Sequence, residues 1–156
     1  MENISKNITF ENWIDYKGKE FFKIENNPNE EQIANGKLIA ENIFEILVEQ
    51  FGKIISLEQG FLNYELGLKI KSNLPFYNGD ALKISGDIDT LINADIFNYI
   101  KDNLEFDSLI WFLGSNKRPQ FIYISYNSEN KKQVLRAKFN KELNKVEFIN
   151  YEPTAI

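Results

Sequence analysis

The chain has 156 residues, of which 43% are hydrophobic and 14% aromatic, enough for one domain with a single core of ordinary size. Its formal net charge of −5 argues against a nucleic-acid partner, because binding a phosphate backbone calls for a basic face. Cysteine and histidine are both absent, so disulfides, thiolate metal sites, and the commonest zinc ligand and general base are excluded.

No stretch approaches the length of a membrane span, and the first residues lack the charged-then-apolar pattern of a secretion signal. We therefore expect a protein made in a cytoplasm, with no membrane partner. No repeat, low-complexity run or linker divides the chain, so residues 1–156 are expected to form one domain. Within it, residues 1–26 would be an N-terminal arm or lid and residues 140–156 a C-terminal hairpin and tail.

An aromatic-rich segment opens the chain. Its members are Trp13, Tyr16, Phe21 and Phe22. Two interpretations stay open at this point: an exposed arm that binds a partner, or a lid that packs across the domain.

The first long predicted element is a helix. Asn27 is its expected N-cap, Pro28 its first helical position and Glu30 its capping-box residue. Apolar residues then recur at helical spacing until Phe51-Gly52 ends the run. The apolar face comprises Ile33, Leu38, Ala40, Ile43, Phe44, Leu47 and Val48.

Short elements follow this helix. Residues 53–57 are predicted to form a buried strand that ends before a break at Gln59-Gly60. Residues 64–70 fit a short helix, and residues 72–79, which contain Pro75 and Gly79, fit a loop.

Predicted strands dominate the second half of the chain, interrupted by one helix over residues 93–104. A tight turn at residues 140–144 joins the last two strands. This order predicts an α+β domain in which the N-terminal helix packs on a mainly antiparallel sheet. The predicted strands cover residues 82–88 with an interruption at Gly86, 106–113, 120–126, 133–139 and 145–151.

Seven short segments occur in a particular order and spacing between about Thr9 and Ala137. They are Asn26-Asn27-Pro28, Phe51-Gly52, Gly60-Phe61, Asp87-Ile88, the run from Phe106 to Trp111, Ile124-Ser125-Tyr126, and Val134-Leu135-Arg136-Ala137. Together they resemble the phage and bacterial zinc D-Ala-D-Ala carboxypeptidases, a family of cell-wall peptidases. The resemblance implies the hedgehog-type peptidase fold for this chain.

The resemblance also implies where the family's functional groups would fall. The family's Ser-x-His-x6-Asp motif supplies two zinc ligands, and here Asp80 stands at its histidine and Asp87 at its aspartate. Tyr123 stands where a His-x-Ser motif supplies the third ligand. Phe112 occupies the position of the catalytic base, and Leu62 that of the arginine that grips the substrate. Only Asp87 keeps the family's residue type.

These replacements remove the chemistry of hydrolysis. Phe112 cannot take a proton from water, and Leu62 cannot pair with a peptide carboxylate. Two carboxylates and a phenol could hold a hard cation such as calcium or magnesium. Structural roles are the preferred interpretation: Asp87 as a turn residue, Asp80 as a solvated loop acid, and Tyr123 as a strand residue with its hydroxyl at the sheet surface. Phe112 and its neighbour Trp111 are expected to serve packing.

We therefore expect a catalytically inactive protein with a peptidase-like fold and no zinc or other cofactor. The resemblance implies a phage virion component in a tail, collar or capsid-associated position, found in the virion or in the producing cell's cytoplasm, with other proteins as partners. One alternative is a module that binds peptidoglycan peptides without cutting them. Another is a peptidase that uses a non-zinc or rearranged metal site around Asp80, Asp87 and Asp89.

Overall fold

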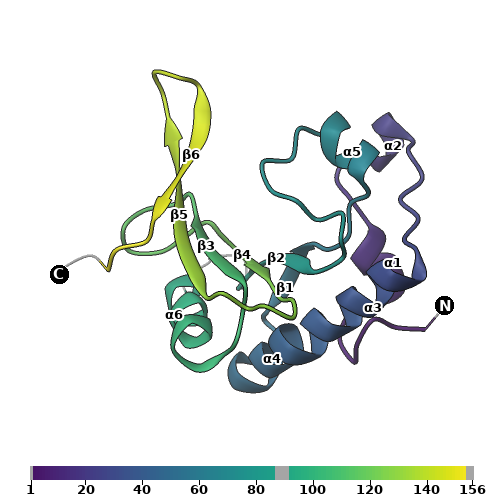
Figure 1. Cartoon of the computed structure of the whole chain (residues 1–156), viewed down its shortest axis with the longest axis horizontal. Coiled ribbons are helices and arrows are strands. Elements are labelled where there is room, and N and C mark those ends of the chain that lie inside the picture. The colour runs from purple at the N-terminus through teal and green to yellow at the C-terminus, as the bar shows by residue number, and fades with distance from the viewer. Residues whose placement is uncertain (1, 87–91, 154–156) are drawn as a thin grey trace.

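A six-stranded mixed sheet forms the centre of the protein in a computed structural model, which describes residues 2–86 and 92–153 (Figure 1). Its strand order is β1-β2-β4-β3-β5-β6. Neighbouring strands are antiparallel except for the parallel pair of β3 and β5. The strands are β1 (Ser56–Gln59), β2 (Ala81–Ser85), β3 (Ser108–Phe112), β4 (Phe121–Ser125), β5 (Gln133–Asn140) and β6 (Lys145–Asn150). The predicted α+β class with a mainly antiparallel sheet is confirmed.

The helices lie mainly in the first half of the chain. They are α1 (Phe10–Ile14), α2 (Lys19–Phe22), α3 (Glu30–Ile39), the π-helical η1 (Ala40–Phe44), α4 (Glu45–Phe51), α5 (Tyr64–Lys69) and α6 (Asn93–Asn103). The short helices α1 and α2 were not predicted. Strand β1 begins three residues later than predicted, because Gly52 ends α4 at a φ of 89° and residues 53–54 form a turn.

The long helix starts two residues later than predicted. Its N-cap is Asn29 rather than Asn27: the Asn29 side chain accepts a hydrogen bond from the Gln32 backbone at 2.8 Å. The Gln32 side chain in turn accepts one from the Asn29 backbone at 2.8 Å, which completes a capping box. From there α3, η1 and α4 run on without a break to Phe51, so the predicted extent of the helix is confirmed at its C-terminal end.

One face of the sheet buries the main hydrophobic core against α3, η1, α4 and α6. Alternate side chains of the central strands point to this face because the pleat has a period of two. They meet the apolar stripes of the first helix and of α6. The prediction for the first helix was wrong at Leu38, which is 51% exposed, whereas the next residue, Ile39, is fully buried. The cluster includes Leu82, Ile84, Ile122 and Ile124 from the sheet, with Ile39, Ile43, Leu47, Ile96, Phe97 and Ile100 from the helices.

The opposite face of the sheet carries a second, smaller core. Segment 62–79, which contains α5, folds over this face and covers part of it. Leu66 of α5 and Phe76 pack there against the strands. The sheet contributes Ala81, Ile110, Tyr123 and Ala137 to this cluster. The central strands β2, β4 and β3 are therefore buried on both faces.

Trp13 of α1 is fully buried and joins the N-terminal segment to the domain. Its ring stacks on Phe61 at a centroid distance of 5.3 Å, and its carbonyl accepts a hydrogen bond from the Phe61 backbone at 2.7 Å. Tyr16 is also buried, whereas Phe21 is 83% exposed. For Trp13 and Tyr16 the structure thus favours the packed lid over the exposed arm, and they are not available as an interface. Of the four aromatic residues, only Phe21 is largely exposed.

Two glycines in helices provide a matched test of this packing. A Cβ on Gly36 of α3 would lie 2.5 Å from the Trp13 ring, whereas a Cβ on Gly67 of α5 would meet nothing within 4 Å. We expect Gly36→Ala to lower the free energy of unfolding by about 1–3 kcal/mol through overpacking. Gly67→Ala should raise it by about 0.5–1 kcal/mol through helix propensity. Urea denaturation measures both, and a stabilising Gly36→Ala would contradict the close contact with Trp13.

A buried amide ties the N-terminal segment to the chain that follows β1. The Asn26 side chain donates to the carbonyls of Ile14 at 2.8 Å and Phe61 at 2.7 Å. Its oxygen accepts from the Asn63 backbone at 2.7 Å. The bond to Phe61 is buried and the other two are partly buried, so water replaces the Asn26 side chain poorly at these backbone groups.

We expect Asn26→Ala to lower the free energy of unfolding by roughly 2–4 kcal/mol, because it leaves three backbone groups unsatisfied. The matched control is the next residue: Asn27 is exposed, and among the described residues its side chain bonds to Glu25 alone, at 3.1 Å. Asn27→Ala should therefore change stability by no more than about 0.5 kcal/mol. Equal effects of the two substitutions in chemical denaturation would refute the role given to Asn26.

Candidate functional site

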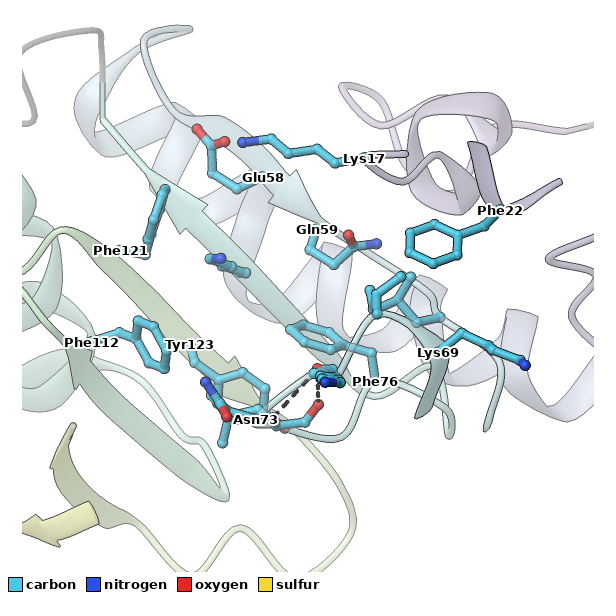
Figure 2. Close-up of a pocket in the computed structure, with 16 residues that line it drawn as sticks. Lys17, Phe22, Glu58, Gln59, Lys69, Asn73, Phe76, Phe112, Phe121 and Tyr123 are labelled. Atoms are coloured by element: carbon cyan, nitrogen blue, oxygen red, sulfur yellow. Dashed lines mark hydrogen bonds between the residues drawn. The ribbon is translucent and has the colours of Figure 1, made fainter. Parts of the chain in front are cut away.

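A cavity of about 450 Å³ opens on the second face of the sheet, beside segment 62–79 (Figure 2). Its floor is formed by Lys83 of β2, Phe112 of β3, and Phe121 and Tyr123 of β4. Its walls come from residues 69–74, from Phe76, and from Lys17 and Phe22 near α2. Figure 2 shows Phe112 and Phe121 on one side of the cavity and Phe22 on the opposite side. We call this cavity the lysine cleft.

The register of the strands explains why these side chains share the floor. Lys83 lies opposite Tyr123, and Phe112 lies opposite Phe121. Directly paired residues point to the same face of a sheet, and alternate residues of one strand do so as well. Lys83, Tyr123, Phe121 and Phe112 must therefore all project to the face opposite the main core.

The wall over residues 72–76 is held by its own hydrogen bonds and by one from the floor. The Ser72 hydroxyl donates to the Leu74 carbonyl at 2.6 Å. The Tyr123 hydroxyl donates to the Pro75 carbonyl at 2.8 Å, and the Tyr123 ring meets Phe76 edge-on at 5.4 Å. Tyr123 is thus the link that fixes the wall to the sheet.

Four lysines and one glutamate make up the charged residues of the lining: Lys17, Lys69, Lys71, Lys83 and Glu58. The chain as a whole is acidic, with 23 acidic and 18 basic residues. The lining of the cleft therefore carries a net positive charge in a protein whose net charge is negative. The Glu58 carboxylate accepts a hydrogen bond from the Ser85 hydroxyl at 2.8 Å. Figure 2 shows the ends of Lys17 and Glu58 turned toward each other.

Lys83 stands at the centre of this arrangement. Its ammonium group lies 4.1 Å from the centre of the Phe121 ring and 5.6 Å from that of Phe112. Ring faces attract cations but satisfy no N–H donor as a carboxylate would. Among the described residues, no carboxylate lies within 4.0 Å of the Lys83 ammonium. Burial lowers the pKa of Lys83 below its usual value of 10.5, the Lys17 cation lowers it further, and Glu58 acts in the opposite direction.

Three of the positions singled out by the resemblance meet in the lysine cleft: Leu62, Phe112 and Tyr123 all line it. Asp80 is not part of this lining, although it precedes β2 directly. Asp87 and Asp89 fall outside the described residues. Trp111 is buried in the main core, as expected for a packing residue. Its neighbour Phe112 packs against the second core, as expected, and also lines the cavity.

Two sequence-based interpretations need correction. The Tyr123 hydroxyl is not at a solvated sheet surface, because residues 72–76 cover it and Pro75 accepts its hydrogen bond. Burial raises the pKa of the Tyr123 phenol, and the Asp80 and Asp107 carboxylates and Tyr77 raise it further, so the neutral form is favoured. Asp80 is not a fully solvated acid either: burial raises the pKa of its carboxyl, its own backbone N–H opposes this, and Asp107 adds to it.

The described residues contain no group of three or more carboxylates placed to hold a metal ion together. Tyr123 as a neutral donor to Pro75 is a poor ligand, because metals bind the phenolate form of tyrosine. Leu62 and Phe112 line the cavity without filling it, since about 450 Å³ stays open. The arrangement suits binding of an anionic group above an aromatic floor.

The residues that give the cleft its charge were not recognised in the sequence. The available signal was Lys83 within Ala81-Leu82-Lys83-Ile84, a lysine inside a strand that is otherwise apolar. Lys17 and Lys71 carried no such signal, because isolated lysines in loops are ordinary surface residues. Their position at the cleft depends on how α2 and segment 62–79 fold over the sheet.

Comparisons with protein families, curated proteins and solved structures found no match to this chain. Among the helices of residues 2–86 and 92–153, none combines the length and the apolar character needed to cross a bilayer.

The environment of Lys83 can be tested by NMR of the reductively ¹³C-methylated protein, with Lys83→Arg to assign its signal. We expect the Lys83 signal to titrate with a midpoint below 10.5, because desolvation disfavours the ammonium form. Lys17→Met should raise the midpoint by removing a like charge, and Glu58→Gln should lower it by removing an opposite charge. A midpoint at or above 10.5, or shifts of the same sign in both variants, would contradict the described cleft.

Proposed function

We propose that this protein is a catalytically inactive member of a peptidase-like fold and works by binding a partner. The observation that supports the proposal best is the meeting of Leu62, Phe112 and Tyr123 in one cavity. In the family that the sequence resembles, the position of Leu62 holds the arginine that grips the substrate, that of Phe112 holds the catalytic base, and that of Tyr123 holds a zinc ligand. Here two are hydrocarbon side chains, and the third is a phenol that donates to Pro75.

The chemistry of these side chains supports binding over hydrolysis. A peptidase of this type needs a group that takes a proton from the attacking water, and neither Leu62 nor Phe112 can do so. The four lysines of the lining supply N–H donors that can hold an anionic group. A cavity with aromatic side chains in its floor and lysines in its lining can hold a partner through both apolar contact and charge.

The kind of partner follows from the family resemblance. Members of the family occur in phages as endolysins and as parts of particles that meet the cell wall. We propose for this chain a structural or interaction role in a virion, in a tail, collar or capsid-associated position, with other proteins as partners. The solvent-exposed Phe21 and the lysine cleft are two surfaces that could make such contacts.

A second candidate is a module that binds peptidoglycan peptides without cutting them. The open volume and the four lysines of the cleft favour it, since such peptides carry carboxylates. Leu62 at the former arginine position weighs against it, because the original carboxylate contact is lost. Titration with soluble peptidoglycan fragments distinguishes it from the first candidate.

The inactive site can be tested by incubating the purified protein with zinc, calcium and magnesium, desalting it, and measuring retained metal. We expect far less than one ion per chain and no change in Asp80→Ala or Asp87→Ala. Digestion of peptidoglycan by the same samples should release no peptide above the buffer control. One retained ion per chain that is lost in either variant, together with peptide release, would overturn the proposal and point to a rearranged metal site.

A further inference from the structure

We propose that the lysine cleft and the apolar surface beside it form a docking groove for an extended segment of another protein, one that presents an acidic side chain between apolar ones. This inference rests on the proposed function, because both assign the cleft a role in binding a partner. It goes further by naming the chemistry of the partner and the residues that recognise it.

Charge is the first reason. The cleft has four lysines to one glutamate, although acidic residues outnumber basic ones in the chain. Among the described residues, no ion pair within 4.0 Å involves Lys17, Lys69, Lys71 or Lys83. Glu58 is already engaged by the Ser85 hydroxyl. A carboxylate entering above Lys83 would therefore gain charge-assisted hydrogen bonds without displacing an existing ion pair.

An apolar row that leaves the cleft is the second reason. Strand pairing places Phe121 opposite Phe112, Phe112 opposite Ala137, and Ala137 opposite Phe148. These four side chains form one cross-strand row on the cleft face of the sheet. Ala137 within the row is fully buried, and the exposed apolar surface lies at the outer end of the row, where Phe148 is 39% exposed and Phe139 on the same face is 51% exposed. The row spans three strand spacings, or roughly 14 Å, which matches about four or five residues of an extended peptide.

The flanking structures limit how a partner could approach. In Figure 1 the outer parts of β5 and β6 project beyond the body of the protein, and α2 and α5 stand on the other side of the cleft face. A small organic anion would occupy the cleft alone and leave the row toward Phe148 uncovered. A polypeptide segment uses both parts, with its acidic side chain over Lys83 and its apolar side chains along the row.

The first experiment selects a random-peptide display library on the wild-type protein, with counterselection on Lys83→Gln. We expect enriched peptides to carry Asp or Glu next to aromatic or aliphatic residues. Enrichment of basic peptides, of peptides without an acid, or of none at all would overturn the inference. The proposed function has its own readout, because mass spectrometry that finds the bound peptide cleaved would refute the inactive site and leave the docking groove standing.

The second experiment measures the affinity of the best fluorescein-labelled peptide by anisotropy. Lys83→Gln and Phe148→Ser should each weaken binding about tenfold or more, and so should replacing the peptide's acid by its amide on the wild-type protein. Lys53→Gln is the matched control for the loss of one charge, because Lys53 is exposed and outside the cleft, and it should bind like the wild type. The peptide variant keeps the test valid if Lys83→Gln fails to fold.

The third measurement separates a polypeptide from a small anion. 3-Phenylpropionate, an aromatic carboxylate small enough for the cleft, should bind far more weakly than the selected peptide and should be insensitive to Phe148→Ser. Equal affinities of the two ligands, or peptide binding that is insensitive to Phe148→Ser, would overturn the polypeptide assignment.

Discussion

The burial of the central strands on both faces is the constraint on which the rest of this structure depends. Because the pleat has a period of two, each residue of β2, β3 and β4 belongs either to the main core or to the cleft face. Leu82 and Ile84 go to the core with Ile122 and Ile124. Their neighbours Lys83 and Tyr123 must then lie together on the other face, directly opposite each other. A one-residue change of register would exchange the two sets and place a lysine in the core.

On the cleft face, packing against aromatic side chains partly buries the charged group of Lys83. Lys83 is held over the Phe121 ring rather than against a carboxylate, and burial with a second lysine nearby lowers its pKa. An ammonium group in such a place loses hydration without full compensation. Natural proteins retain arrangements of this kind at sites that bind ligands, where the missing compensation comes from the ligand.

The wall of the cleft depends on contacts between segments that are distant in the chain. Asn26 and the Trp13 carbonyl hold residues 61–63 in place, and α5 and the loop that covers Tyr123 follow directly. The N-terminal segment is therefore part of the structure that shapes the cleft. Its role explains why Trp13 and Tyr16 are buried although their sequence context allowed an exposed arm.

The sequence by itself determined the α+β class, the extent of the long helix up to Phe51, and the positions of β2, α5, α6, β3 to β6 and the final tight turn, because these depend on local periodicity and turn residues. It also identified three positions, Leu62, Phe112 and Tyr123, that line one cavity. Only the tertiary structure decided that the cavity stays open and that Lys17 and Lys71 join Lys83 in its lining. The reason is that no local pattern predicts which loop lysine will face which strand. The N-cap at Asn29 was a similar case: Asn27 and Asn29 are equally good caps in sequence, and the reciprocal bonds of Gln32 select the second.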